Sequence, residues 1–151
     1  MTALALTGLS AGYDRDLPIV KGVSFTVQRG EAVCILGPNG AGKSTMIKAI
    51  AGLVPCFGGE VRLDGTDITG LASHVLVGKG MGFVPQTENM FTRLTILENL
   101  QIAAQLLPKQ DRPGRIDAMF AMFPDLGSRP RELAGALSGG QRQMLAAARA
   151  L

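Results

Sequence analysis

The fold is decided by residues 32–45, which read Ala32-Val33-Cys34-Ile35-Leu36-Gly37-Pro38-Asn39-Gly40-Ala41-Gly42-Lys43-Ser44-Thr45. Residues 32–36 form an unbroken apolar run, the pattern of a strand that is covered on both faces. A glycine-rich loop follows, and a helical stretch then runs from Lys43 to about Gly52. A strand, a loop and a helix in this order form half of a βαβ unit, so the sequence predicts an α/β fold.

The loop matches the Walker A pattern, in which two glycines precede a lysine and a serine at fixed spacing. Small residues let successive backbone N–H groups turn inward around phosphate oxygens, and the following helix directs its positive end at the same anions. The lysine suits the β- and γ-phosphates, the serine hydroxyl suits Mg²⁺, and the threonine hydroxyl can donate to an α- or β-phosphate. These residues therefore predict a site for ATP and Mg²⁺ lined by Gly37, Pro38, Asn39, Gly40, Ala41, Gly42, Lys43, Ser44 and Thr45.

A second constellation, Leu137-Ser138-Gly139-Gly140-Gln141, is a serine-capped, glycine-rich start to a helix that runs to the end of the sequence. Such a start is an anion site in principle, because it presents free N–H groups at the positive end of a helix. By itself the pattern is weak, since many helices begin in this way. About a hundred residues downstream of a Walker A loop, it becomes specific.

With both motifs the sequence resembles the ABC ATPases, whose signature motif is this pentapeptide, and the resemblance covers all 151 residues. It implies that Gln86, in Phe83-Val84-Pro85-Gln86, is the Q-loop glutamine that reaches Mg²⁺ or the attacking water. It also implies that Tyr13 is the aromatic residue that stacks on adenine. An exposed loop tyrosine without a ligand is the alternative for Tyr13.

The resemblance also implies a mechanism in which a second ABC ATPase subunit packs head to tail with the first, with two ATP molecules between them. Ser138 and the N–H groups of Gly139 and Gly140, in the turn that contains Gln141, would then touch the γ-phosphate bound to the other subunit. Lys43, Gln86 and Ser138 would be the catalytic groups. ATP closes such a dimer and hydrolysis lets it open, so one ligand stabilises two states differently.

The fold implied by the resemblance is an α/β P-loop NTPase with an N-terminal antiparallel β subdomain and an α-helical subdomain. We expect an ATP-binding core with Walker A and Q-loop over 1–86, a helical subdomain over 87–137, and the signature motif and its helix over 138–151. The family's Walker B run with Asp-Glu and its switch histidine do not occur in the sequence. We therefore expect a partial domain that lacks the Walker B half of the core and the general base, folds poorly alone and hydrolyses no ATP.

The remaining pattern predicts further elements around these motifs. Thr95 and Glu98 have the spacing of a capping box at the start of a helix over 94–107. Apolar residues at helical spacing after a polar loop at 109–114 indicate core packing rather than ligand binding. The other expected elements are strands at 3–9, 22–28, 59–63 and 82–85, a turn at Asp64-Gly65, and helical core positions at Ile116, Met119, Phe120 and Phe123.

Composition limits the function classes. The formal net charge of +3 is too modest to indicate nucleic acid as a partner. No apolar run approaches the roughly 18–20 residues that span a bilayer, and the N-terminus lacks a signal-peptide pattern. Cys34 and Cys56 fit reduced, structural thiols, and His74 fits a loop or a helix surface. We therefore expect a cytosolic chain that acts peripherally at the cytoplasmic face of the inner membrane, bound to integral-membrane permease subunits.

Three segments are similar to the ATPases of branched-chain amino acid importers: 64–71, 82–100 and 143–146. The similarity implies import of branched-chain or other hydrophobic amino acids, delivered by a periplasmic substrate-binding protein. An ATPase of another importer or of an exporter would share every motif above. A soluble ABC protein acting on DNA or ribosomes is a further alternative, but such proteins usually carry two cassettes or large basic insertions, and this sequence has neither.

Overall fold

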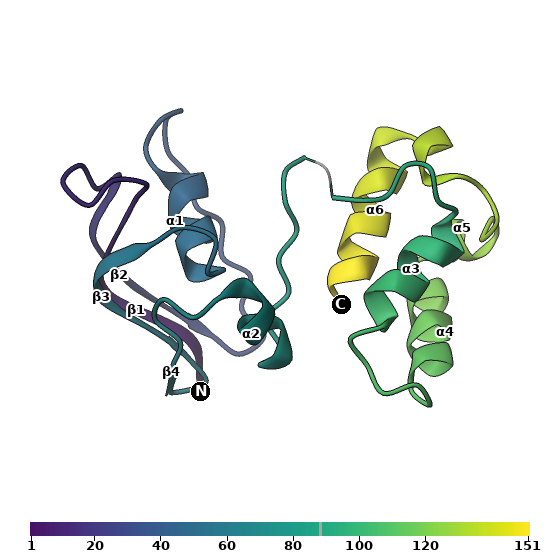
Figure 1. Ribbon diagram of the computed structural model, residues 1–151, viewed down its shortest axis with the longest axis horizontal. Coiled ribbons are helices and arrows are strands. Elements are labelled where there is room, and N and C mark those ends of the chain that lie inside the picture. Colours follow the sequence, from purple (N-terminus) through teal and green to yellow (C-terminus); the bar gives the residue numbers. More distant parts are fainter. Residues whose placement is uncertain (88) are drawn as a thin grey trace. The chain divides into compact units, whose positions relative to one another are not determined.

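The computed structural model describes residues 1–87 and 89–151 (Figure 1). These residues form two compact units, an N-terminal unit, Met1–Met81, and a C-terminal unit, Gly82–Leu151. No helix in the described parts of the chain is long and apolar enough to cross a bilayer.

The N-terminal unit is built on an antiparallel sheet with the strand order β2-β1-β3-β4. Leu6 of β1 pairs with Phe25 of β2 on one side and with Val61 of β3 on the other, which fixes the register of the three long strands. The strands expected at 3–9, 22–28 and 59–63 are confirmed. The elements of this unit are β1 (Thr2–Ala11), β2 (Val20–Gln28), α1 (Lys43–Ile50), β3 (Cys56–Leu63), β4 (Thr66–Asp67) and α2 (Ser73–Gly78).

The turn expected at Asp64-Gly65 joins β3 to β4 as a two-residue hairpin. Both residues have positive φ, 47° and 77°, as the tightest hairpin turns require. Leu63 pairs with Thr66 directly across this turn. The α2 helix was not predicted from the sequence, because it has no side-chain cap to mark its start.

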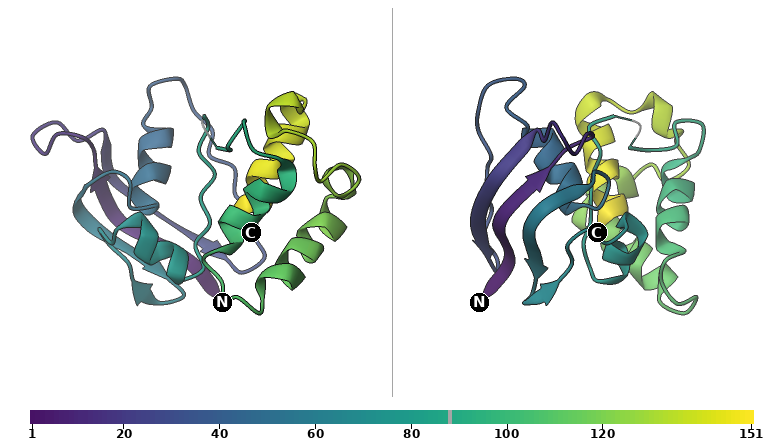
Figure 2. Two further views of the ribbon diagram at one scale, coloured as in Figure 1. Left: turned by 45° about the vertical axis from the view of Figure 1, so that its right-hand side comes forward. Right: turned by 60° about the vertical axis from the view of Figure 1, so that its left-hand side comes forward.

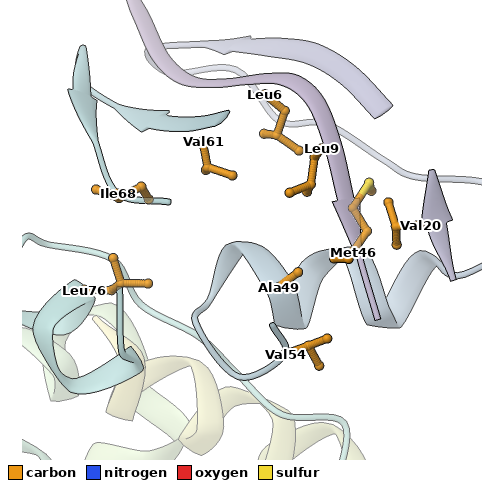
Figure 3. Packing of buried hydrophobic residues seen from close by; sticks show 10 residues of the cluster. Leu6, Leu9, Val20, Met46, Ala49, Val54, Val61, Ile68 and Leu76 are labelled. Carbon is orange, nitrogen blue, oxygen red and sulfur yellow. The ribbon is translucent and has the colours of Figure 1, made fainter. Parts of the chain in front are cut away.

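Helix α1 packs on one face of this sheet (Figures 1 and 3). Its buried face, Met46 and Ala49, meets Leu6 and Leu9 of β1 and Val61 of β3 in one hydrophobic cluster. Burying a leucine or methionine side chain contributes about 1.5–3 kcal/mol, so the cluster fixes the helix firmly to the sheet. The loop that precedes α1 therefore ends on an anchored element.

The prediction of strands at 32–36 and 82–85 is wrong: both segments are irregular in this structure. A strand exists through its ladder of hydrogen bonds, and no pairing partner for either segment occurs among residues 1–87 and 89–151. Their apolar side chains are correspondingly accessible, with Val33 48% and Leu36 85% exposed. Cys34 is exposed for the same reason.

The C-terminal unit is helical and has its own core, in which α3 lies alongside α6 (Figure 2). The predicted packing of Ile116, Met119, Phe120 and Phe123 is confirmed: Met119 belongs to the buried cluster, and the other three are partly buried and pack against that cluster. The loop expected at 109–114 is wrong in its second half, because Pro113 lies in the first turn of a helix, where proline is favourable. The elements are α3 (Ile96–Ala104), α4 (Arg112–Met122), α5 (Pro124–Gly127), the 3₁₀ turn η1 (Ala134–Ala136) and α6 (Gly139–Ala150).

The capping box at the start of α3 is confirmed. The Thr95 hydroxyl accepts a hydrogen bond from the Glu98 N–H at 3.2 Å, and the Glu98 carboxylate accepts one from the Thr95 N–H at 2.7 Å. These bonds from Thr95 lower the pKa of the Glu98 carboxyl below its ordinary value. The sequence signal was sufficient here because both partners lie within one turn.

Asn99, on the following turn of α3, is completely buried. Its side-chain oxygen accepts from the Phe91 N–H at 2.9 Å, and its amide donates to the carbonyls of Phe91 and Thr95, each at 2.9 Å. One side chain thus holds the chain segment before α3 against the helix.

We expect Asn99→Ala to destabilise the protein by about 1–3 kcal/mol, because the partly buried N–H and C=O of Phe91 would lose their side-chain partner. The measurement is urea unfolding followed by circular dichroism. Gln101→Ala, at an exposed position of the same helix, is the control and should change stability by less than about 0.5 kcal/mol. Equal midpoints for the two variants would contradict the role assigned to Asn99.

Candidate nucleotide-binding site

The phosphate loop, residues 37–42, ends in a position that only glycine fits. Gly42 is the N-cap of α1 and has a φ of 82°, a left-handed conformation that side chains disfavour. A Cβ atom built there would lie 3.1 Å from Cγ2 and 3.3 Å from the carbonyl oxygen of Ile19. The loop is therefore pressed against the connection between β1 and β2.

The side chain of Lys43 folds back over this loop. Its Nζ atom donates to the carbonyl oxygens of Gly37 at 2.7 Å and Pro38 at 2.6 Å. An ammonium group has three N–H donors, so one donor remains for another acceptor. The two bonds hold the positive charge at the phosphate loop, which leads directly into α1.

The first turn of α1 supplies further donors. The Met46 N–H makes the first bond of the helix, to the Gly42 carbonyl at 2.8 Å. The N–H groups of Lys43, Ser44 and Thr45 precede it and therefore have no acceptor within the helix. Ser44 is exposed and Thr45 is 8% exposed. The amides and one ammonium proton can donate hydrogen bonds to a triphosphate. The accessible Ser44 hydroxyl oxygen can be a ligand of the accompanying Mg²⁺.

Tyr13 lies in the connection between β1 and β2, the same connection that contacts Gly42 through Ile19. Its ring is 65% exposed and is therefore accessible for stacking on a flat ligand. An exposed tyrosine without a ligand has the same description, so both interpretations of Tyr13 stay open.

Ser138 begins α6 with a capping box. The Ser138 hydroxyl oxygen accepts from the Gln141 N–H at 3.3 Å, and the Gln141 side-chain oxygen accepts from the Ser138 N–H at 3.0 Å. The reciprocal bond of Gln141 was missed from the sequence, although the Ser-x-x-Gln spacing is its signal. The Ser138 hydroxyl keeps its proton as a donor, and the N–H groups of the exposed Gly139 and Gly140 belong to the first turn.

The structure assembles the site residues in two groups. The phosphate loop, Lys43, Ser44 and Thr45 come together in the N-terminal unit, and Ser138 to Gln141 come together in the C-terminal unit. Gln86 is exposed and belongs to the C-terminal unit. The described residues contain no group of three or more His, Cys, Asp or Glu side chains that could hold a metal ion.

The family described as "ABC transporter" matches residues 20–151. The chain belongs to the ABC transporter family. The family recognised from the sequence and the ABC ATPase fold are thereby confirmed.

Solved cassettes have the same fold: the ADP conformation of the ATP-binding cassette MJ1267 superimposes with a TM-score of 0.85 at 29% identity, covering 100% of this chain and 65% of that one. A dimeric structure of the bacterial cassette MJ0796 gives 0.79 at 30% identity, with 98% and 68% covered.

Relatives in the ABC family include ATP-binding proteins of branched-chain amino acid transport and of lipopolysaccharide export. The chain is 44% identical over 143 residues to a probable branched-chain amino acid transport ATP-binding protein, LivF, of Archaeoglobus fulgidus, covering 95% of this chain and 60% of that protein. It is 39% identical over 139 residues to BraG of Pseudomonas aeruginosa, a high-affinity branched-chain amino acid transport ATP-binding protein, covering 92% and 60%. It is also 37% identical over 154 residues to LptB of Haemophilus influenzae, a lipopolysaccharide export ATP-binding protein, covering 100% and 63%. The chain thus spans about 60% of the length of these relatives.

We expect Ser138→Ala to destabilise the protein by about 1 kcal/mol, because the N-cap of α6 is lost. Ser138→Asp is the matched variant: its carboxylate can accept the Gln141 N–H and should keep stability within about 0.5 kcal/mol. The measurement is the free energy of unfolding in urea. Equal losses in the two variants would show that the hydroxyl does not act as a cap.

Proposed function

We propose that this chain is the ATP-binding part of an ABC transporter ATPase, and that it holds ATP·Mg²⁺ on residues 37–45. The observation that carries the proposal is the Lys43 ammonium, which is bonded to two carbonyls of the phosphate loop and has a third proton to donate. A triphosphate placed there accepts that proton and the N–H groups of the first helical turn. The Ser44 hydroxyl then joins the phosphate oxygens around Mg²⁺, and the Tyr13 ring stacks on the adenine.

The second nucleotide contact comes from the signature turn of another ABC ATPase subunit. In each subunit the Ser138 hydroxyl proton and the N–H groups of Gly139 and Gly140 remain available as donors, and they cap the γ-phosphate held by the partner. The dimeric structure of MJ0796 supports this assembly. Because the γ-phosphate bridges two subunits, ATP favours the closed dimer and its hydrolysis favours opening.

We propose three further properties for the full-length protein: ATP hydrolysis, transport of a substrate and binding to a permease. They concern the full-length protein because residues 1–151 cover about 60% of the length of the transport relatives. Gln86 contacts Mg²⁺ or orients the attacking water in this scheme. The general base belongs to the family's Walker B segment, a run that residues 1–151 do not contain. The protein would then act at the cytoplasmic face of the inner membrane, bound to permease subunits.

For the transported substrate we propose branched-chain or other hydrophobic amino acids, taken up from a periplasmic substrate-binding protein. The names and identities of LivF, at 44%, and BraG, at 39%, support branched-chain amino acids as the transported class. The alternative is export, supported by LptB at 37% identity. A soluble ABC protein that binds nucleic acid is disfavoured by the net charge of only +3.

Replacing Lys43 by methionine tests the nucleotide site. The variant keeps the side-chain length and removes the charge, so we expect affinity for a fluorescent ATP analogue to fall about 10- to 100-fold, the loss of one charge-assisted hydrogen bond. Lys48→Met removes the same charge from an exposed position of the same helix and is the control. Equal affinities for the two variants would refute the proposal.

The direction of transport is tested with the full-length protein, its permease subunits and the binding protein in proteoliposomes. We expect leucine-loaded binding protein to stimulate ATP turnover several-fold and labelled leucine to cross toward the ATPase side. Lys43→Met should abolish both signals. Turnover that responds to lipopolysaccharide and not to leucine would replace the import assignment with export.

A further inference from the structure

The last turn of α6 holds the segment that carries Gln86. The Arg149 Nη1 atom donates to the Asn89 carbonyl at 2.5 Å, and the centre of its guanidinium lies 4.8 Å from the centroid of the Phe91 ring. Sixty residues separate Arg149 from Asn89, so this is a tertiary contact. A planar group that donates in its plane and stacks on a ring fixes both the position and the orientation of its partner.

The same turn also contacts the beginning of that segment. A Cβ atom added to Gly82 would lie 2.6 Å from the Ala150 carbonyl oxygen, so the backbone passes α6 at a distance that only glycine allows. Between these contacts, Phe83, Val84 and Pro85 line a small cavity whose other wall includes Ala146, Arg149 and Ala150. The described residues from Gly82 to Phe91 are therefore held at both ends by the end of one helix.

Within the segment, further bonds connect these anchors to Gln86. The Asn89 side chain donates to the Pro85 carbonyl at 3.3 Å, which joins the residues on the two sides of Gln86. The Phe91 backbone is fixed in turn by the buried Asn99 of α3. These contacts restrain the backbone on both sides of Gln86. Gln86 itself is exposed, so its side chain remains accessible.

Arg149 is an unusual residue for its place in α6, because Leu145, Ala146 and Ala148 around it are buried. Partial burial lowers the pKa of its guanidinium, and its Nε atom has no hydrogen-bond partner among residues 1–87 and 89–151. Burying a charged group costs free energy that an apolar residue would not cost. Its two contacts with Asn89 and Phe91 are the specific gain that offsets this cost.

We propose that Arg149 is a positioning residue that couples the signature turn to Gln86 through α6. Ser138 and Arg149 stand at opposite ends of this helix, about 16 Å apart at 1.5 Å per residue. A shift of the signature turn when it binds a γ-phosphate therefore moves Arg149, and with it the segment that carries Gln86. The inference rests on the function proposed above, in which both ends act on ATP.

The test is a double-mutant cycle in the full-length protein with Arg149→Met and Gln86→Ala, singly and together. Methionine resembles arginine in length and helix propensity and removes the planar charge. Because a misplaced catalytic group costs up to about 100-fold, we expect Arg149→Met to lower kcat about 10- to 100-fold while KM for ATP stays within about twofold. In the Gln86→Ala protein the same change should cause no further loss. An equal loss in both backgrounds, or an unchanged kcat, overturns the proposal.

A second readout is independent of turnover. Hydrogen exchange of the Phe91 amide, which donates to Asn99, should rise at least about tenfold in Arg149→Met, while the amides of β1 stay unchanged. Arg142→Met, at an exposed position of the same helix, is the matched control. If Arg149→Met does not fold, Arg149→Lys, which keeps a donor but loses the planar group, provides the comparison. Unchanged exchange overturns the coupling; loss of ATP binding in the unaltered protein would instead refute the proposed function.

Discussion

The proposed site depends on holding the Lys43 ammonium and the first N–H groups of α1 close together without a negatively charged side chain beside them. Like charges and parallel N–H dipoles repel one another, so such a cluster exists only where the rest of the fold holds it. Two devices hold it here: the buried face of α1, Met46 and Ala49, on the sheet, and the contact of Gly42 with Ile19. The Lys43 ammonium is steadied by two carbonyls of its own loop. Among the residues that the structure describes, the N–H groups of Lys43, Ser44 and Thr45 have no backbone acceptor, which is the basis of the proposed anion site.

The two helices of the proposed mechanism, α1 and α6, differ in how many N–H groups of the first turn are left for a ligand. Helix α1 begins at a left-handed glycine and has no side-chain cap, so all the N–H groups of its first turn are left for a ligand. Helix α6 begins with the Ser138–Gln141 capping box, which uses the Gln141 N–H and leaves those of Gly139 and Gly140. The uncapped start suits a triphosphate with its many oxygens. The capped start suits a single terminal phosphate and stays ordered without one.

The sequence predicted those features whose partners are close along the chain. The turn at Asp64-Gly65, the Thr95–Glu98 box and the loop around Lys43 are each complete within a few residues. The prediction of strands at 32–36 and 82–85 was wrong, because a strand needs hydrogen-bonded partner strands and a local sequence pattern does not identify them. The same limit applies to the site: the contact of Arg149 with Asn89 spans sixty residues, and only the structure brings the two together.

The proposed catalytic groups are divided between the two units because each group is attached to a different hydrophobic core. Lys43 and Ser44 stand on a helix packed into the core of the N-terminal unit, whereas Gln86 is bonded through Asn89, Phe91 and Arg149 into the C-terminal unit. Each unit keeps its own hydrophobic cluster, so the two groups of side chains are ordered by separate cores. The segment that carries Gln86 is bonded to α6 through Arg149, and α6 begins at the signature turn, so in the proposed coupling a shift of the turn moves Gln86.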